Sequence, residues 1–545
     1  MNPDQNCLVF GNIITMDPER PLAQAMAISK GKIIAVGSIK ECCQTIKEPC
    51  TRHDYQGKTV LPGLIDSHNH MYGTGLQESL LDLSRCESIS DILDAVHTYA
   101  TANPHKEWIV GAQGWQINSI KERRYPTRHE LDQVSPYRPV FLPRIYHAAA
   151  VNSLALKLAN LTRETPDPAG GRIVRDECGE PTGELQESPA FGPIEALLPP
   201  LSHTEKVSAL LSIQNEYLRL GICGVIDPGL TSDDLALYRQ IKANGQLRVR
   251  TVTMPLAPTA MGKNAVSDWL KKLEKRTGSG DSQLKLGGIK VFLDGGASLG
   301  TALLREPYPG TKCNCGIQVT DTETFRLIAH FCGENGWSLG VHTVGGKAID
   351  LALQVFREVD SKTPIRDLRF SLIHAYLWPS QKNIQQACEL GVAVATQAAM
   401  QYQFAPGLTS QFGRDPIARA TPIRSWIDGG VLVAGGSDAP TIPANPFLGM
   451  WHSTTRYVDA LQEALGLDQA ISRQEALELY TTKAAWLSFS EHERGALKPG
   501  LVADWIVVDH NPLECSQDQL KGIQVLDTAI GGMIVHRTMP PTTQA

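Results

Sequence analysis

The stretch 60-VLPGLIDSHNH-70 decides the fold, because it combines a strand-like apolar run, a Pro-Gly break and a His-x-His pair. Alternate side chains of an extended strand point to the same face, so His68 and His70 project together while Asn69 points elsewhere. Two imidazoles that converge at a strand end can bind one metal ion. Taken alone, the pair could equally well pack or form hydrogen bonds there, so other parts of the chain must decide.

The composition is that of an ordinary globular protein. The chain has 545 residues, of which 42% are hydrophobic and 20% charged, and its formal net charge is -6. This length predicts more than one ordinary domain. An acidic balance without basic runs argues against nucleic-acid binding. The N-terminus has no secretory signal and no apolar run is long enough to span a bilayer, so we expect a cytoplasmic protein without a membrane partner.

Twelve cysteines are too few for a disulfide scaffold in a chain of this length. We therefore expect mostly free thiols in a reducing compartment. Cys42 and Cys43 are adjacent, and Cys313 and Cys315 form the only other close pair. A Cys-x-Cys could bind metal, but no second close pair with zinc-site spacing accompanies it. A loop with incidental thiols is the favoured interpretation.

The two ends of the chain share one sequence pattern. Residues 7–60 hold short β-like runs separated by turn residues, and similar runs return only at 496–509 and 523–536. Chain termini tend to lie near each other at a domain surface. We therefore predict one β-sandwich built from residues 1–60 and 491–545, with residues 61–490 forming a separate unit between its two halves.

From residue 205 onward, single helix-like segments alternate with short apolar strands. With the first strand included, about eight strands alternate in this way, which predicts an α/β fold with a closed (β/α)8 TIM barrel. Residues 76–205 break this rhythm with many glycines and prolines. We interpret them as an insertion after the first barrel strand that can cover the active site.

Chemically reactive side chains follow the predicted barrel strands one after another: His68, His70, Lys290, His342, His374 and Asp438. Active sites of such barrels lie at the carboxyl ends of the strands. Each residue alone could be an ordinary core or turn residue. As an ordered set they provide nitrogen and oxygen ligands that suit two divalent cations such as zinc.

With these ligand positions, the chain resembles members of the amidohydrolase superfamily, and within it amidohydrolase family 3, over nearly its whole length. The resemblance rests on the motifs LPGLIDSHNH, Gly-Trp at 114–115, YPTRHELDQVSPYRPVFL, HAAAVNSLAL, PTGELQE, IKVFLDGGASLGTALL, VHTVGGKAI, LIHAYL, GGSDAP and RGALKPGLVADWIVVD. It implies a (β/α)8 barrel with a β-sandwich made from both termini, in agreement with the pattern of strands and helices.

The resemblance also implies a ligand set. His68 and His70 would bind one ion, His342 and His374 a second, and Asp438 would complete the first site. Lys290 would bridge both ions as an N-carboxylated lysine formed with carbon dioxide. A protonated ammonium only donates and repels cations, whereas a carbamate offers two oxygens. An unmodified Lys290 would instead favour a mononuclear site.

The implied mechanism is attack by a hydroxide that bridges the two ions. Asp438 would be the general base, and His147 would hold the carbonyl or the tetrahedral oxyanion. Trp115, His147 and Glu187 are candidate substrate-binding residues, although each could equally well pack.

Two departures from the family pattern bear on the substrate. Gln116-Ile117 stands where an acidic residue usually follows Gly-Trp, and Gly345-Gly346 replaces the common Gly-Asp. The loss of these carboxylates suits a neutral, aromatic amide better than a cationic substrate.

The predicted function is metal-dependent hydrolysis of a C–N bond in an amide, N-formyl or carbamate-like small molecule. An ester or lactone hydrolase, or a decarboxylase, could use the same site. A scaffold protein that has lost its metals is disfavoured because all six expected ligand positions are filled. A homodimer is the default expectation for assembly.

Overall fold

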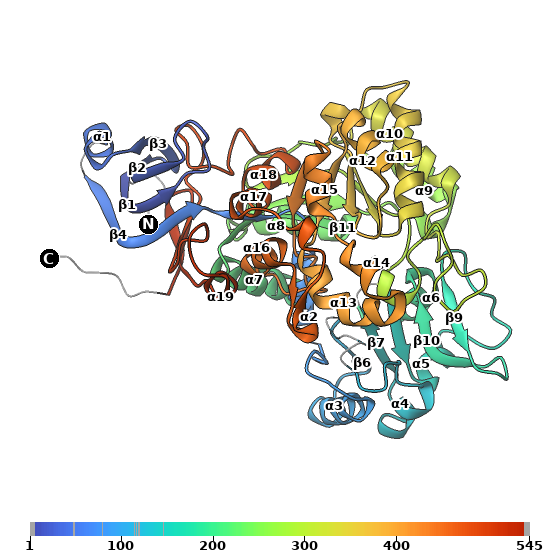
Figure 1. Cartoon of the computed structure of the whole chain (residues 1–545). Helices are drawn as coiled ribbons and strands as arrows, with labels where there is room; N and C mark the ends of the chain where they lie inside the picture. The colour runs from blue at the N-terminus through green and yellow to red at the C-terminus, as the bar shows by residue number, and fades with distance from the viewer. Residues whose placement is uncertain are drawn as a thin grey trace.

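The computed structural model describes residues 6–46, 49–78, 80–113, 115, 117, 120–144 and 147–538 (Figure 1). The fold is mixed α/β, as predicted. Helices and parallel strands alternate through the central part of the chain, and antiparallel sheets occupy the ends and the insertion. Among the described residues, no helix combines the length and the apolar character needed to cross a membrane.

The centre of the molecule contains two parallel sheets, of four and five strands, in the orders β13-β12-β11-β5 and β14-β15-β16-β17-β18. Their strands are β5 (Leu64–Asp66), β11 (Ile222–Leu230), β12 (Arg250–Pro255), β13 (Leu284–Leu286), β14 (Ile289–Phe292), β15 (Leu339–Thr343), β16 (Ser371–His374), β17 (Ala393–Thr396) and β18 (Val433–Gly435). Because only two glycines separate β13 from β14, the nine segments occupy eight strand positions. The predicted alternation of strands and helices is confirmed.

Backbone hydrogen bonds connect the two sheets at two places. The Ala257 N–H, just after β12, donates to the Lys290 carbonyl in β14 over 3.0 Å. At the second place, the Ser67 N–H donates to Gly435 O over 3.0 Å, and the Asp438 N–H donates to His68 O over 2.8 Å. The first and the last parallel strands therefore meet where the predicted ligands emerge.

Helices cover the outside of the parallel strands, and several begin with a side-chain cap. Ser202 accepts a hydrogen bond from the Glu205 N–H while the Glu205 carboxylate accepts from the Ser202 N–H, which fixes the first turn of α7. The helices of this part are α2 (Met71–Gln77), α7 (His203–Arg219), α8 (Ser232–Ala243), α9 (Lys263–Lys271), α10 (Thr322–Asn335), α11 (Gly346–Asp360), α12 (Gln381–Leu390), α13 (Ala399–Phe412), α14 (Arg414–Ala418), α15 (Ile423–Asp428), α16 (Pro446–Thr455), α17 (Arg473–Leu479) and α18 (Thr482–Leu487). A short hairpin, β19 (Tyr457–Val458) and β20 (Glu463–Ala464), follows α16.

Both ends of the chain contribute to one seven-stranded sheet, in the order β23-β22-β21-β4-β1-β2-β3. The sheet comprises β1 (Asn6–Ile14), β2 (Leu22–Ser29), β3 (Lys32–Gly37), β4 (Cys50–Pro62), β21 (Trp505–Val508), β22 (Val525–Ile530) and β23 (Met533–Arg537), accompanied by α1 (Ile39–Thr45) and α19 (Gln517–Lys521). β4 pairs antiparallel with β21, which joins the two halves. The predicted meeting of the two ends is therefore observed.

This sheet curls around a common core. Ile33 from one edge strand and Ala529 from the other end of the sheet belong to the same buried apolar cluster. The Ile33 N–H also donates to Leu501 O over 3.0 Å. A strictly two-layered sandwich and the predicted domain limits at 60 and 490 stay predictions, and residues 1–5 and 539–545 lie outside the described part.

The segment predicted as an insertion forms a unit with its own sheet, in the order β6-β7-β8-β10-β9. Its elements are α3 (Ile89–Ala102), β6 (Ile109–Val110), α4 (Arg128–Val134), β7 (Val140–Arg144), β8 (Ala148–Val151), α5 (Ser153–Leu158), β9 (Arg172–Arg175), β10 (Pro181–Gln186) and α6 (Ser188–Glu195). It is more regular than its many glycines and prolines indicated. Arg123 donates to the Ser410 hydroxyl on α13 over 3.3 Å, and Figure 1 shows this unit beside α13.

A buried ion pair joins the terminal sheet to the parallel strands. Arg250 in β12 donates from Nη2 to Asp504 Oδ1 over 2.9 Å, and the Gly531 N–H donates to the same oxygen over 2.8 Å. Both charged side chains are buried. Breaking such a pair leaves an uncompensated charge, at a typical cost of about 3–5 kcal/mol.

We expect Asp504→Ala to lower the free energy of unfolding by about 3–5 kcal/mol, measured as the shift of the first transition in urea. The matched control is Glu389→Ala, which breaks an exposed pair with Arg357. Exposed pairs contribute about 0–1 kcal/mol. Equal shifts of the unfolding transition in the two variants would show that the Arg250–Asp504 pair does not stabilise the contact between the terminal sheet and the parallel strands.

Candidate metal centre and active site

The six predicted ligands lie around one edge of the parallel strands. His68 and His70 follow β5, Lys290 lies within β14, His342 lies within β15, His374 ends β16, and Asp438 follows β18. Carboxyl ends of parallel strands meet on one side, so six positions spread over 370 residues of sequence come together. All except His70 are buried, and His70 is only partly exposed.

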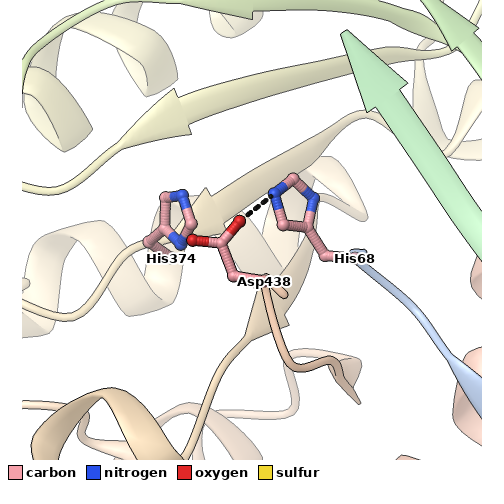
Figure 2. A group of neighbouring side chains, drawn as sticks. All are labelled: His68, His374 and Asp438. Atoms are coloured by element: carbon pink, nitrogen blue, oxygen red, sulfur yellow. Dashed lines mark ion pairs between the residues drawn. The ribbon is translucent and has the colours of Figure 1, made fainter. Parts of the chain in front are cut away.

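Asp438 makes the closest contacts in the cluster. Its Oδ1 lies 3.1 Å from His68 Nε2 and 3.2 Å from His70 Nε2. Ligand atoms of His68, His374 and Asp438 all lie within 4.8 Å of one another. Figure 2 shows the carboxylate between the two imidazoles. Asp438 therefore lies near His68, which is predicted to bind the first ion, and near His374, which is predicted to bind the second. Which ligands bind which ion stays a prediction.

His342 and Lys290 extend this cluster. The rings of His342 and His374 are 4.7 Å apart between centroids, and those of His68 and His374 are 5.3 Å apart. Lys290 Nζ lies 4.8 Å from the centroid of the Phe292 ring. The charge of Lys290 lowers the pKa of His68, and the charge of Asp438 raises the pKa of Lys290. The lysine therefore belongs to the same buried group of polar side chains.

Two buried polar atoms of this group, Lys290 Nζ and His342 Nδ1, form no hydrogen bond within the described part of the chain, and His68 Nε2 contacts only the Asp438 carboxylate there. Buried polar groups are nearly always satisfied, so each such atom requires an explanation. Imidazole nitrogens and a carboxylate are the ligands that zinc and similar divalent ions prefer. The donor set fits a metal centre, and a carboxylated Lys290 would add two oxygens.

The electrostatics also suit metal binding. Burial lowers the pKa of His374 to about 4 and holds the pKa values of His68 and His342 well below the usual range. Burial would raise the pKa of Asp438, but hydrogen bonds with His68 and His70 outweigh it and hold that pKa well below its usual range. Near neutral pH His68, His342 and His374 are therefore uncharged and Asp438 is ionised, which are the forms that bind metal.

Asp66 fixes the two loops that hold His68 and Asp438. Its Oδ1 accepts hydrogen bonds from the backbone N–H groups of His68 and Ser437, over 3.2 and 2.9 Å. Its Oδ2 accepts from Asn69 Nδ2 and from the Ser437 hydroxyl. Asp66 lies within the motif that holds His68 and His70, but no role was predicted for it. Its position two residues before the first histidine was the available signal.

Two further residues position the remaining histidines, and neither was identified from the sequence. The Gln397 side-chain oxygen contacts His374 Nδ1, which orients that ring. Asp294 accepts backbone hydrogen bonds from Leu303, Val344 and Gly345, over 2.8 to 2.9 Å. It thereby fixes the loop that follows His342.

The backbone is strained where two of the ligands lie. His374 and Asp438 have positive φ angles of 72° and 61°. Non-glycine residues in this region cost about 1–3 kcal/mol and cluster at functional sites. Gly436 lets the loop before Asp438 lie close to the backbone of His68, because a Cβ on residue 436 would lie 2.6 Å from the His68 backbone nitrogen.

His147 and Glu187 form a buried pair from the insertion. His147 Nδ1 lies 2.8 Å from Glu187 Oε2, and the Thr301 hydroxyl contacts the other carboxylate oxygen. Burial would lower the pKa of His147, but the negative charge of Glu187 raises it overall. The ring of His147 lies 5.0 Å from that of His342. The pairing orients His147 toward the ligand cluster.

Trp115 occupies a different environment. It packs in the apolar core of the insertion and donates from Nε1 to Pro143 O over 2.9 Å. The residues that line the pocket beside the ligands include His147 but neither Trp115 nor Glu187. Substrate contacts for Trp115 and Glu187 stay predictions, and Gly114 and Gln116 lie outside the described residues.

We expect His68→Ala to leave the purified protein with substoichiometric metal, because it removes one of the imidazoles that contact Asp438. His97→Ala, on the exposed face of α3, is the matched control and should retain the wild-type metal content. Elemental analysis after gel filtration provides the measurement. Wild-type metal content in both variants would exclude His68 as a ligand.

Comparison with known proteins places the chain in a family. The model of the Amidohydrolase family matches residues 53–536. The putative amidohydrolase YtcJ of Bacillus subtilis (strain 168) is 32% identical over 535 residues, which cover 96% of this chain and 98% of that protein. The N-substituted formamide deformylase of Arthrobacter pascens is 28% identical, with 97% of each chain covered.

A solved structure supports the same fold. An uncharacterized metal-dependent hydrolase from Pyrococcus furiosus superimposes with a TM-score of 0.72 at 24% identity, covering 93% of this chain and 100% of that one. The match to the family model spans most of the chain and includes all six predicted ligands. The chain therefore belongs to the amidohydrolase family and is a metal-dependent hydrolase acting on carbon–nitrogen bonds.

Proposed function

We propose that the chain hydrolyses an amide, N-formyl or carbamate-like bond of a small molecule at a site that binds two divalent ions, such as zinc. The buried cluster of imidazoles around the Asp438 carboxylate, with the unpaired amine of Lys290 and with His147 beside it, carries this proposal. The name of the Arthrobacter relative, an N-substituted formamide deformylase, is consistent with a C–N bond of this kind.

We further propose that the parallel strands form a closed (β/α)8 barrel and that Lys290 is carboxylated. Closure is supported by the hydrogen bonds that join β5 to β18 and β12 to β14 at their ends. Carboxylation is supported by the environment of Lys290, because burial lowers the pKa of its amine to about 7. An amine must be neutral to attack carbon dioxide, and a cationic one would repel metal ions.

When bound, the ions would supply a hydroxide nucleophile near neutral pH and would polarise the substrate carbonyl. Asp438 is ionised and lies at the centre of the ligands, so it can accept the proton of the attacking water. It then hands this proton to the departing nitrogen, which leaves as an amine. His147, held by Glu187, donates a hydrogen bond to the substrate oxygen as negative charge develops there.

The bond type is tested directly with metal-loaded enzyme. We expect amine release from a panel of formamides, amides and carbamates to exceed acid release from the corresponding esters. Preferential cleavage of esters would instead favour the ester or lactone hydrolase.

We expect Asp438→Asn to keep most of its bound metal but to lose about 10²–10⁴-fold in turnover, because the amide cannot accept the proton. Asp428→Asn, at an exposed ion pair with Arg424, is the matched control and should turn over normally. Elemental analysis and steady-state kinetics provide both readouts. Near-wild-type turnover in Asp438→Asn would show that Asp438 is not the general base.

A pH dependence follows from the lowered pKa of Lys290 in the metal-free protein. With a pKa of about 7, the neutral amine is the minor form at pH 6 and the main form at pH 8. An ordinary lysine, with a pKa of about 10.4, would be almost fully charged at both values. Reaction with carbon dioxide therefore requires pH near or above 7.

We expect carbon dioxide to accelerate zinc uptake by metal-free protein about tenfold more at pH 8 than at pH 6, as set by the fraction of neutral amine. The dissolved carbon dioxide concentration is held constant, and uptake without it is subtracted at each pH. Lys290→Met should show no such acceleration. Uptake by the wild type that does not depend on carbon dioxide would contradict carboxylation.

A further inference from the structure

A cavity opens at the surface between two helices that cover the parallel strands. Residues of α8 and α9 form its walls, and its volume is about 380 Å³, within the range of small-molecule sites. The residues that line it include none of the predicted metal ligands and none of those that line the pocket beside them. The cavity is therefore separate from the proposed active site.

The inner surface of this cavity is apolar and rich in aromatic atoms. Trp269 on α9 and Trp337, just before β15, both line it, and Trp337 is buried beneath the opening. The remaining apolar lining residues come from both helices and from the ends of β12 and β13: Leu235, Leu273, Pro255 and Leu286. Trp269, Leu235 and Leu273 stay partly exposed. A flat aromatic ligand would cover this surface.

The rim of the cavity has an excess of positive charge. Arg239 on α8, Lys272 after the last residue of α9, and Lys275 in the following segment are all exposed and all line it. Of the described residues that line the cavity, only Glu274 is acidic. Three cations thus surround one carboxylate, in a chain whose formal net charge is -6.

Nearby lysines are neutralised by ion pairs, but the three cations of the rim are not. Lys242 pairs with Asp281, Lys263 with Glu323, and Lys271 with Asp268. In the part of the chain that the structure describes, Arg239, Lys272 and Lys275 form no ion pair. Their positive potential is therefore available to an anion that enters the cavity.

We infer that the cavity between α8 and α9 binds a small aromatic anion, such as an aryl carboxylate. The ring of this ligand packs on the surface formed by Trp269 and Trp337, and its charge lies among Arg239, Lys272 and Lys275. A neutral aromatic molecule would leave the cations unpaired, and a cationic one would be repelled by them. This site goes beyond the proposed hydrolysis and does not depend on it.

The first test compares a charged probe with a neutral one by isothermal titration calorimetry on full-length, metal-loaded protein. The probes are naphthalene-2-sulfonate and methyl 2-naphthyl sulfone, which share the same ring system. A sulfonate is a weak ligand for zinc, so the probe does not compete for the metal centre. We expect one sulfonate to bind per chain with a Kd of about 1 mM or tighter, as is typical for a molecule of this size.

The neutral sulfone should bind at least about tenfold more weakly, because it lacks the charge that strengthens hydrogen bonds to guanidinium and ammonium groups. Equal affinities for the two probes would overturn the inference, and so would a sulfonate that does not bind at all.

A pair of double variants tests the charges of the rim. Arg239→Gln combined with Lys272→Gln should weaken sulfonate binding at least about tenfold, because it removes two charge-assisted contacts. The matched control combines Lys263→Gln with Lys271→Gln, which removes two paired lysines from the same region that do not line the cavity. It should change the Kd less than about threefold, because exposed and paired charges contribute little. Equal losses in both double variants would show that only the overall charge matters.

A second pair of variants tests the place of binding. Leu235→Trp fills the cavity between α8 and α9 and should abolish sulfonate binding. Leu201→Trp places the same ring in the cavity of about 340 Å³ beside His70 and should leave the Kd unchanged. Circular dichroism and the melting temperature verify that each variant is folded. Binding that Leu235→Trp leaves intact would place the sulfonate elsewhere and overturn the inference.

Sedimentation velocity excludes a second copy of the chain as the occupant. The sedimentation coefficient of the wild type should be the same with and without naphthalene-2-sulfonate, and the same in Leu235→Trp. A sulfonate that dissociates an oligomer, or an oligomer that Leu235→Trp disrupts, would show instead that the cavity belongs to a subunit interface.

Discussion

The contact of one carboxylate with two imidazoles is the interaction on which the rest of the structure depends. Asp438 Oδ1 lies within 3.2 Å of both His68 and His70, and all three groups are removed from water or nearly so. Ionised and polar groups are costly to bury unless they are paired or bind a metal. These groups lie where the ends of β5 and β18, the first and last parallel strands, are joined by backbone hydrogen bonds.

The scaffold around this contact limits how far the ligands can move. Asp66 connects the loop of His68 to the loop of Asp438 with four hydrogen bonds, and it is itself fully buried. The positive φ angle of Asp438 is tolerated because the bonds from Asp66 to Ser437 fix the neighbouring backbone. A metal site needs ligands held in a defined geometry, and this network fixes the loops of His68 and Asp438. Stability and metal affinity are therefore coupled through Asp66.

The ligand positions and the meeting of the two chain ends could be predicted from the sequence. The ligands follow apolar runs at strand ends, and parallel strands place such positions on one edge whatever the connecting segments do. The meeting of the chain ends followed from their shared strand pattern. The regular sheet of the insertion was not foreseen, because its short strands are separated by glycines and prolines. Gln397, Asp294 and the pairing of His147 with Glu187 also escaped prediction, since they depend on side-chain contacts between segments far apart in sequence.

We propose that four histidines, Asp438 and a carboxylated Lys290 together hold two divalent ions. A crystal structure of protein purified without chelators, with anomalous diffraction recorded at the zinc edge, tests this claim most directly. The account predicts two metal peaks among His68, His70, His342, His374 and Asp438, with additional density on Lys290 that bridges them. Crystals in which zinc binds elsewhere, or in which the cluster remains empty after zinc soaking, would contradict it.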